Sequence, residues 1–139
     1  MRSTGIHHID LVVSSIERSL PFYKGLLEPL GWTDLEEVEG ERGETIWYIS
    51  GLGTTIGLRE KQSEANPVPY DRYGVGVHHV CFEVESRSVV DERAEWLRAQ
   101  GAQIESGPKE YWYMPGYYAV FFYDPDGLKL ELVHIPERR

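Results

Sequence analysis

Histidines occur in adjacent pairs at two places in the sequence, each inside a nonapeptide of nearly the same pattern. Residues 5–13 read GIHHIDLVV and residues 76–84 read GVHHVCFEV, so the pairs His7–His8 and His78–His79 occupy equivalent positions of a repeat. Imidazole is the commonest side-chain ligand of protein-bound metal ions. Two repeat-equivalent histidines therefore indicate a metal site as the first chemistry to consider.

The periodicity of the nonapeptides separates the two histidines of each pair. Apolar residues recur at every second position, which predicts two β-strands with alternating faces. If an amphipathic helix covers the apolar face of each sheet, His8 and His79 point to the opposite face. His7 and His78 fall with the apolar residues, and we expect them to be partly buried, hydrogen-bonded and structural.

A carboxylate for the same site lies in the last strand-like run, residues 128–135, which follows the turn sequence DPDG. The leucines of this run alternate onto the helix-covered face, so Glu131 lies on the face of the histidines. A solvated glutamate on a wet sheet face is the alternative. If the two sheets curl, His8, His79 and Glu131 converge, and about three positions of an octahedral ion remain open for substrate, water or oxygen.

The elements that position these residues also repeat. Each histidine strand is followed by a helical segment that ends at a glycine, and then by three strand-like runs. The predicted fold class is α+β, with two βαβββ modules that form curved mixed sheets around a metal-containing cavity. Module 1 covers residues 5–60, module 2 covers residues 76–135, and a polar linker, residues 61–75, joins them in one domain of residues 1–139.

Two signals in the sequence compete for the start of the first helix. Ser14 and Glu17 have the spacing of a capping box, which favours an early start. Pro21 fits the first turn of a helix better than its interior, and this moves the expected start of the regular helix to about Ser19.

Composition limits the partners and the location of the protein. The chain has 14 basic and 23 acidic residues and a formal net charge of −9. Nucleic acids and anionic membrane surfaces require a clustered basic footprint, so we expect neither, and a small-molecule substrate is favoured. The single cysteine, Cys81, excludes an internal disulfide and is expected in the core. The N-terminus has no features of a signal peptide, which favours a cytoplasmic location.

The ordered motifs resemble the vicinal oxygen chelate superfamily over essentially the whole chain. They are H-x-x-L-x-V followed by ERSLPFY, residues 17–23, then H-x-x-F-x-V and the closing DPDG-x-x-x-E-L. That superfamily includes glyoxalase I, extradiol dioxygenases, fosfomycin-resistance enzymes, methylmalonyl-CoA epimerase and bleomycin-binding proteins. The resemblance implies that His8, His79 and Glu131 hold one divalent ion, Fe²⁺, Mn²⁺, Ni²⁺ or Zn²⁺, with Glu131 also catalytic. It further implies that modules pair within one chain or across a homodimer, of which we expect the homodimer.

Two positions depart from the patterns of particular family members. Glyoxalase I usually has a second glutamate on the last strand of the first module, where this chain has Gly57. Extradiol dioxygenases and fosfomycin enzymes commonly have a tyrosine at the position of Phe121. These departures weaken the assignment to glyoxalase I and the assignment to the dioxygenases or fosfomycin enzymes without excluding either. The intact ligand set of His8, His79 and Glu131 argues against a protein that only sequesters a ligand.

Other residues could line a substrate pocket. The stretch KEYWYMPGYY, residues 109–118, is dense in aromatic residues, of which Tyr111, Tyr113 and Tyr118 are candidate pocket walls; the alternative is an aromatic loop that packs the rim. Arg59 could meet an anionic substrate group, or it could be a solvent-exposed residue at a strand end. The substrate-binding prediction is Arg59, Tyr113 and Phe121.

The sequence therefore predicts a metal-dependent enzyme whose small substrate chelates the ion through vicinal oxygens. Lyase, isomerase, dioxygenase and transferase chemistry all remain open, because a fold does not fix a reaction. The alternative from another class is a non-catalytic binding or resistance protein that sequesters a drug or metabolite.

Overall fold

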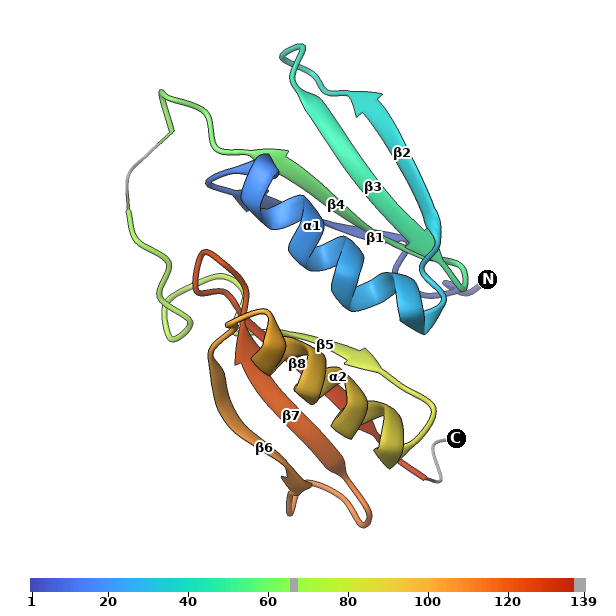
Figure 1. Ribbon diagram of the computed structural model, residues 1–139. Coiled ribbons are helices and arrows are strands. Elements are labelled where there is room, and N and C mark those ends of the chain that lie inside the picture. The colour runs from blue at the N-terminus through green and yellow to red at the C-terminus, as the bar shows by residue number, and fades with distance from the viewer. Residues whose placement is uncertain (66–67, 137–139) are drawn as a thin grey trace. The chain divides into compact units, whose positions relative to one another are not determined.

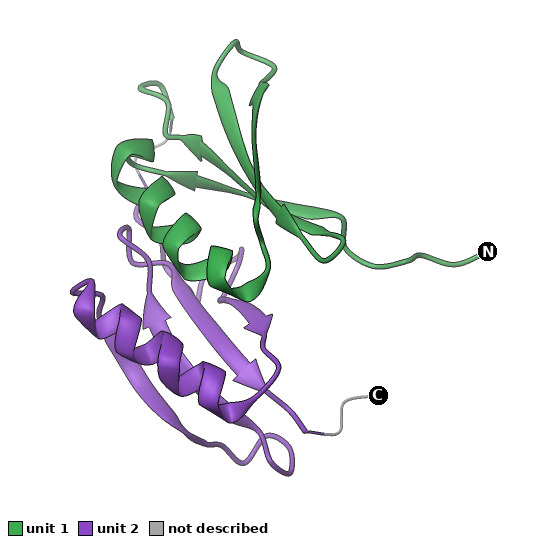
Figure 2. Ribbon diagram, turned by 45° about the vertical axis from the view of Figure 1, so that its right-hand side comes forward, with its two compact units in different colours: residues 1–67 green, residues 68–139 purple. Residues whose placement is uncertain are grey.

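The computed structural model describes residues 1–65 and 68–136, and the chain divides into two compact units, residues 1–67 and 68–139 (Figure 2). Each unit contains a βαβββ motif with a four-stranded mixed sheet. The α+β class and the two βαβββ modules predicted from the sequence are confirmed. Neither helix in the described ranges has the length and apolar character needed to cross a lipid bilayer.

The first unit has its strands in the order β1-β4-β3-β2. Its elements are β1 (His8–Val13), α1 (Ile16–Leu27), the short 3₁₀ helix η1 (Glu28–Leu30), β2 (Asp34–Glu39), β3 (Thr45–Gly51) and β4 (Thr54–Glu60). β1 pairs with β4 in parallel, and the other pairs are antiparallel. The parallel pair places the histidine strand beside the last strand of its unit.

Helix α1 begins earlier than we expected. The Ser15 side chain caps the helix by accepting a hydrogen bond from the Arg18 amide, and the Glu60 carboxylate accepts one from the Ile16 amide. Both bonds satisfy amides that have no partner inside the helix. Pro21 lies within the helix, so the expected start near Ser19 is wrong. The missing proline N–H costs one bond, and burial of the apolar face outweighs it.

The core of the first unit lies between α1 and one face of its sheet (Figure 1). Tyr23, Leu26 and Leu27 of the helix are completely buried, and Ile56 and Leu58 of β4 are at most 2% exposed. Burying each such side chain stabilises the fold by roughly 1.5–3 kcal/mol. The alternation predicted for β1 is confirmed, because Leu11 and Val13 face this core, whereas His8 and Val12 lie on the opposite face.

The second unit has its strands in the order β5-β8-β7-β6. Its elements are β5 (Val80–Glu83), α2 (Arg87–Ala99), β6 (Ile104–Glu110), β7 (Tyr118–Tyr123) and β8 (Lys129–His134). Ser86 caps α2 by accepting a hydrogen bond from the Val89 amide, as Ser15 does for α1. The two serines occupy equivalent positions of the sequence repeat, so the repeat extends to the capping chemistry.

Helix α2 covers one face of this sheet (Figure 1). Val90 and Leu97 of the helix pack in a core with Phe122, Leu130 and Leu132, all completely buried. The β7–β8 register pairs Leu132 with Val120 and Leu130 with Phe122. Residues at the intervening positions of these strands therefore lie on the face opposite α2.

Part of the predicted linker packs on the second unit. The Tyr70 hydroxyl shares its single hydrogen between the carbonyl oxygens of His78 at 2.8 Å and Val77 at 3.1 Å. These bonds fix the segment that leads into β5 and therefore the backbone that carries His79. Residues 66 and 67 of the predicted linker lie outside the described residues.

Candidate metal centre

Glu131 and His79 form a close pair on the face of the second sheet opposite α2. The His79 Nε2 atom lies 3.0 Å from Glu131 Oε1. Glu131 is only 1% exposed, so the alternative of a solvated glutamate is wrong. An isolated buried carboxylate is costly, and it is tolerated when it is paired or binds a metal. The burial of Glu131 therefore points to a functional pair.

A third residue, which the sequence analysis missed, completes the environment of Glu131. The Tyr117 hydroxyl donates a short hydrogen bond to Glu131 Oε2. Burial, followed by the neighbouring carboxylate, raises the pKa of Tyr117 far above its ordinary range, so the hydroxyl keeps its proton. Tyr117 shares its strand parity with Phe121, which pairs directly with Glu131, and this parity was the signal in the sequence.

Each histidine pair is joined through its ring nitrogens. The two Nδ1 atoms of His78 and His79 lie 2.9 Å apart, and those of His7 and His8 are also 2.9 Å apart. In each pair one ring must donate and the other accept, so the tautomers of neighbouring residues are linked. His7 and His78 are hydrogen-bonded as expected. Both are exposed, so the prediction that they are partly buried is wrong.

Among residues 1–65 and 68–136, no three His, Cys, Asp or Glu side chains are gathered so that they could hold an ion. His8 belongs to the first unit, and its side chain is 44% exposed. Its Nε2 atom lies 4.0 Å from Asp10 Oδ1, a buried oxygen with no hydrogen-bond partner among the described residues. A positive charge at His8 would therefore face a carboxylate oxygen.

Gly57 occupies a position that has no room for a side chain. A Cβ atom there would lie 2.3 Å from Asp10 Oδ1 and 2.4 Å from Tyr48 Cε1. Both distances are shorter than van der Waals contact, so Asp10 and Tyr48 would have to move. The missing second carboxylate of the glyoxalase I pattern is thus linked to the packing of this face.

Arg59 is held by carboxylates of its own unit. It contacts Asp10 at 2.8 Å and both Glu41 and Glu44 at 3.2 Å. Its side chain is 20% exposed, so it is not the solvated strand-end residue that was the alternative. Three carboxylates more than compensate one guanidinium, which weakens its predicted role as an anion receptor.

Aromatic side chains surround the buried pair. The Phe121 ring centre lies 6.0 Å from that of His79 and 5.2 Å from that of Tyr111. Tyr113 stacks on Tyr111 at 5.8 Å and is 53% exposed. Tyr118 was a wrong candidate for a pocket wall, because its hydroxyl bonds to Asp91 of α2 on the other side of the sheet.

Cys81 is an exposed residue and not the core residue we expected. It pairs with Glu131 across β5 and β8, so alternation places it on the face of His79. Partial shielding of the thiol from water, followed by the charge of Glu131, raises the pKa of Cys81 well above its ordinary range. In the metal-free protein the Cys81 thiol is therefore protonated at neutral pH.

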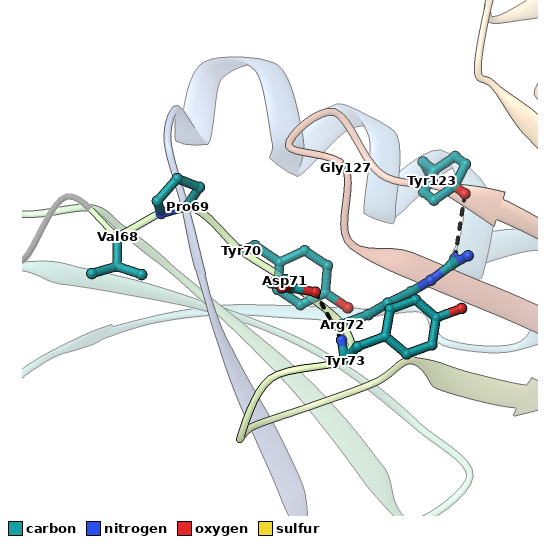
Figure 3. A pocket seen from close by; sticks show the side chains of 8 residues that line it. All are labelled: Val68, Pro69, Tyr70, Asp71, Arg72, Tyr73, Tyr123 and Gly127. Atoms are coloured by element: carbon teal, nitrogen blue, oxygen red, sulfur yellow. Dashed lines mark hydrogen bonds between the residues drawn. The ribbon is translucent and has the colours of Figure 1, made fainter.

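A charged cluster borders this face of the second sheet. Glu105 accepts hydrogen bonds from Arg72 at 2.7 Å, from Lys129 at 3.3 Å and from the Tyr123 hydroxyl. The bond from Arg72, and then the other donors, lower the pKa of Glu105 to about 2. Arg72, Tyr123 and Tyr73 also line an open pocket of about 660 Å³ (Figure 3).

We expect the stabilising effect of Glu105 to depend on pH. Its pKa falls from an ordinary value of 4.5 to about 2 on folding, so the ionised form stabilises the folded state fully above about pH 4.5. This contribution is lost as the pH falls toward 2. Urea unfolding of the wild type and Glu105→Gln should show a difference in unfolding free energy that shrinks over this range. A difference that stays constant with pH would contradict the expectation.

Residues 5–132 match the Glyoxalase/Bleomycin resistance protein/Dioxygenase superfamily, and the chain belongs to this family. The resemblance predicted from the sequence motifs is thereby confirmed. It establishes the class of protein that this fold and this buried His–Glu pair belong to, and it leaves the reaction open.

Individual relatives cover most of the chain. YqjT of Bacillus subtilis is 33% identical over 129 residues, which are 92% of this chain and 97% of YqjT. Metallothiol transferase FosB of Staphylococcus saprophyticus is 28% identical over 127 residues, which are 91% of this chain and 74% of FosB. A solved glyoxylase/bleomycin resistance protein/dioxygenase domain from Frankia superimposes with a TM-score of 0.78 at 25% identity, covering 96% of this chain and 98% of that domain.

Proposed function

We propose that this protein is a metal-dependent enzyme that acts on a small substrate with two vicinal oxygens. The ligands are His79 and Glu131 of the second unit and His8 of a first unit. The observation that supports this proposal most directly is the buried Glu131 carboxylate, which is held between His79 and Tyr117.

The donor atoms of the His79–Glu131 pair fit a divalent first-row ion. Imidazole nitrogen with carboxylate oxygen is a ligand set common to Fe²⁺, Mn²⁺, Ni²⁺ and Zn²⁺. Two donors that are each about 2.1 Å from one ion, at a right angle, lie about 3.0 Å apart. The observed Nε2–Oε1 distance is 3.0 Å. The Tyr117 hydroxyl and the His78 ring supply the outer hydrogen bonds that usually orient such ligands.

The side chains around the pair have separable roles in this proposal. A bound divalent ion would supply Lewis-acid polarisation of the two substrate oxygens. Tyr117 holds Oε2 of Glu131, which leaves Oε1 to face the ion, so Glu131 would act as a base only when Oε1 leaves the ion. Phe121, 6% exposed, excludes water beside His79 and strengthens the electrostatic interactions there.

Comparison with particular relatives indicates which reactions this protein is expected to catalyse and which it is not. FosB is named a metallothiol transferase, which makes group transfer to a small molecule one candidate reaction. Phe121 departs from the pattern of both dioxygenases and fosfomycin enzymes, and Gly57 departs from that of glyoxalase I. We therefore expect ring cleavage of catechol and glyoxalase turnover to be slow or absent, and group transfer is the candidate that FosB supports despite Phe121.

A non-catalytic binder of small molecules is the second candidate. The stacked Tyr111 and Tyr113 rings beside Phe121 favour it, because aromatic walls suit capture of a planar ligand. Metal content separates the two candidates, since the enzyme should regain about one divalent ion per site and a sequestering protein has no such requirement.

We expect catechol to bind the open positions of the site. Fe²⁺ is restored anaerobically to the metal-free protein, and catechol should then change the visible spectrum of the iron at a stoichiometry of one per site. Hydroxamates and α-hydroxycarbonyl compounds, which also present two vicinal oxygens, should compete with it. No spectral change with any of these ligands would contradict the proposed function.

The assembly that completes the site is proposed to be a homodimer. Small members of this superfamily commonly exchange modules, as the sequence resemblance implies, and one chain would then supply His8 to the pair of its partner. A closed two-fold assembly contains two equivalent sites.

The absence of any disulfide is consistent with the reducing cytoplasm, which we propose as the location of the protein.

A further inference from the structure

Two groups of basic side chains, Arg59 in the first unit and Arg72 with Lys129 in the second unit, are compensated very differently. In the first unit Arg59 contacts three carboxylates. In the second unit Arg72 and Lys129 share one carboxylate, that of Glu105. This hydrogen-bonded cluster therefore has one more positive than negative charge, although the whole chain has a formal net charge of −9. The Glu131 carboxylate on the same face balances this charge in the metal-free protein, and a bound divalent ion would restore the local positive excess that attracts anions.

Lys129 lies on the same strand and the same face as Glu131. The two residues are separated by one position of β8, so their Cα atoms are about 6.7 Å apart and their side chains are parallel. The Lys129 Nζ atom lies 4.7 Å from the Phe121 ring centre, and that ring lies 6.0 Å from the ring of His79. The face therefore presents the His–Glu pair, an aromatic ring and an ammonium group next to one another.

The Lys129 ammonium group is held in place, but its contact with the Glu105 carboxylate is long. Its side chain is only 11% exposed, and its contact with Glu105 Oε2 is 3.3 Å long. Charge-assisted hydrogen bonds of this type are usually about 2.7–2.9 Å. An ammonium group has three donors, and a second anionic acceptor would offset the cost of its burial.

We propose that Lys129, supported by Arg72, binds a carboxylate or similar anionic group of the substrate whose vicinal oxygens face His79 and Glu131. This assignment rests on the proposed function and adds a substrate class to it: compact acids with two adjacent oxygens at one end and an anionic group at the other. The sequence assigned the anion contact to Arg59, which three carboxylates already compensate. The proposal assigns this contact to Lys129 of the second unit instead.

Catechol and 3,4-dihydroxybenzoate test the subsite, because they share the chelating oxygens and differ in the carboxylate. Calorimetry on the Zn²⁺-loaded wild type should show about tenfold tighter binding of the acid. Lys129→Met should remove this preference and Lys129→Arg should keep it. Glu105→Gln should enlarge it, because both cations lose their shared counter-charge. Comparing the affinity ratio across variants cancels the different acidity of the two compounds.

The control variant is Arg98→Met, which removes a basic side chain of the same unit that lies on α2 and pairs with Glu95, and it should leave the affinity ratio unchanged. Zinc content is measured for every variant, and each should keep one ion per site. If neither compound binds the loaded wild type, both the subsite and the proposed function are wrong. If both compounds bind with the same ratio in the wild type, Lys129→Met and Glu105→Gln, the proposed function stands and the subsite is wrong.

Discussion

Stoichiometric metal binding should be lost when His79 is replaced by alanine or Glu131 by glutamine. Each change removes one of three proposed ligands, and the second also removes the only charge among them. The loss of affinity should exceed the roughly 10–100-fold that removal of an outer hydrogen-bond partner costs. Calorimetric titration of the metal-free protein with Zn²⁺ measures the effect directly.

His78→Ala is the matched control for this experiment. His78 is adjacent to His79 and bonds to its Nδ1 atom at 2.9 Å, so its removal deletes an imidazole without deleting a proposed ligand. The variant should still bind one ion per site, with an affinity lowered by no more than that 10–100-fold range. Wild-type affinity in His79→Ala would show that the pair is a structural ion pair.

Strand alternation was sufficient to predict on which face of the second sheet Glu131 lies. The period-two pattern placed His79 and Glu131 on one face, and their side chains contact each other at 3.0 Å. A pattern of faces, however, contains no information on burial. Glu131 was compatible with solvent exposure in the sequence, and its 1% exposure depends on packing by residues from several strands.

The parity of Tyr117 indicates its face of the sheet, but its bond to Glu131 could not be predicted from local patterns. Its hydroxyl bonds to a residue 14 positions away, and the bond requires the conformation of the aromatic loop that precedes β7. Sequence spacing does not determine that loop conformation. The start of α1 was missed for a related reason, because the penalty for Pro21 is local whereas the compensating burial of Tyr23 and Leu26 is tertiary.

Mixing two inactive variants should restore metal binding if the site is shared between chains. His8→Ala and Glu131→Gln each lack one ligand, and neither homodimer should bind metal. In a mixed dimer with exchanged modules, one site combines both defects, and the other combines the intact His8 of one chain with the intact Glu131 of its partner. Random subunit exchange at equal concentrations makes half of the dimers mixed, so about a quarter of all sites should bind metal.

The same mixture gives a different result if each site forms within one chain. Every site then contains either the His8 or the Glu131 defect, and no combination of chains repairs it. Metal content after co-refolding equal amounts of the two variants therefore distinguishes the arrangements, and light scattering establishes that the mixture is dimeric. As a control, His8→Ala refolded alone should remain metal-free. A dimeric mixture without recovered sites would contradict sharing between chains, and a monomer at micromolar concentration would contradict the proposed homodimer itself.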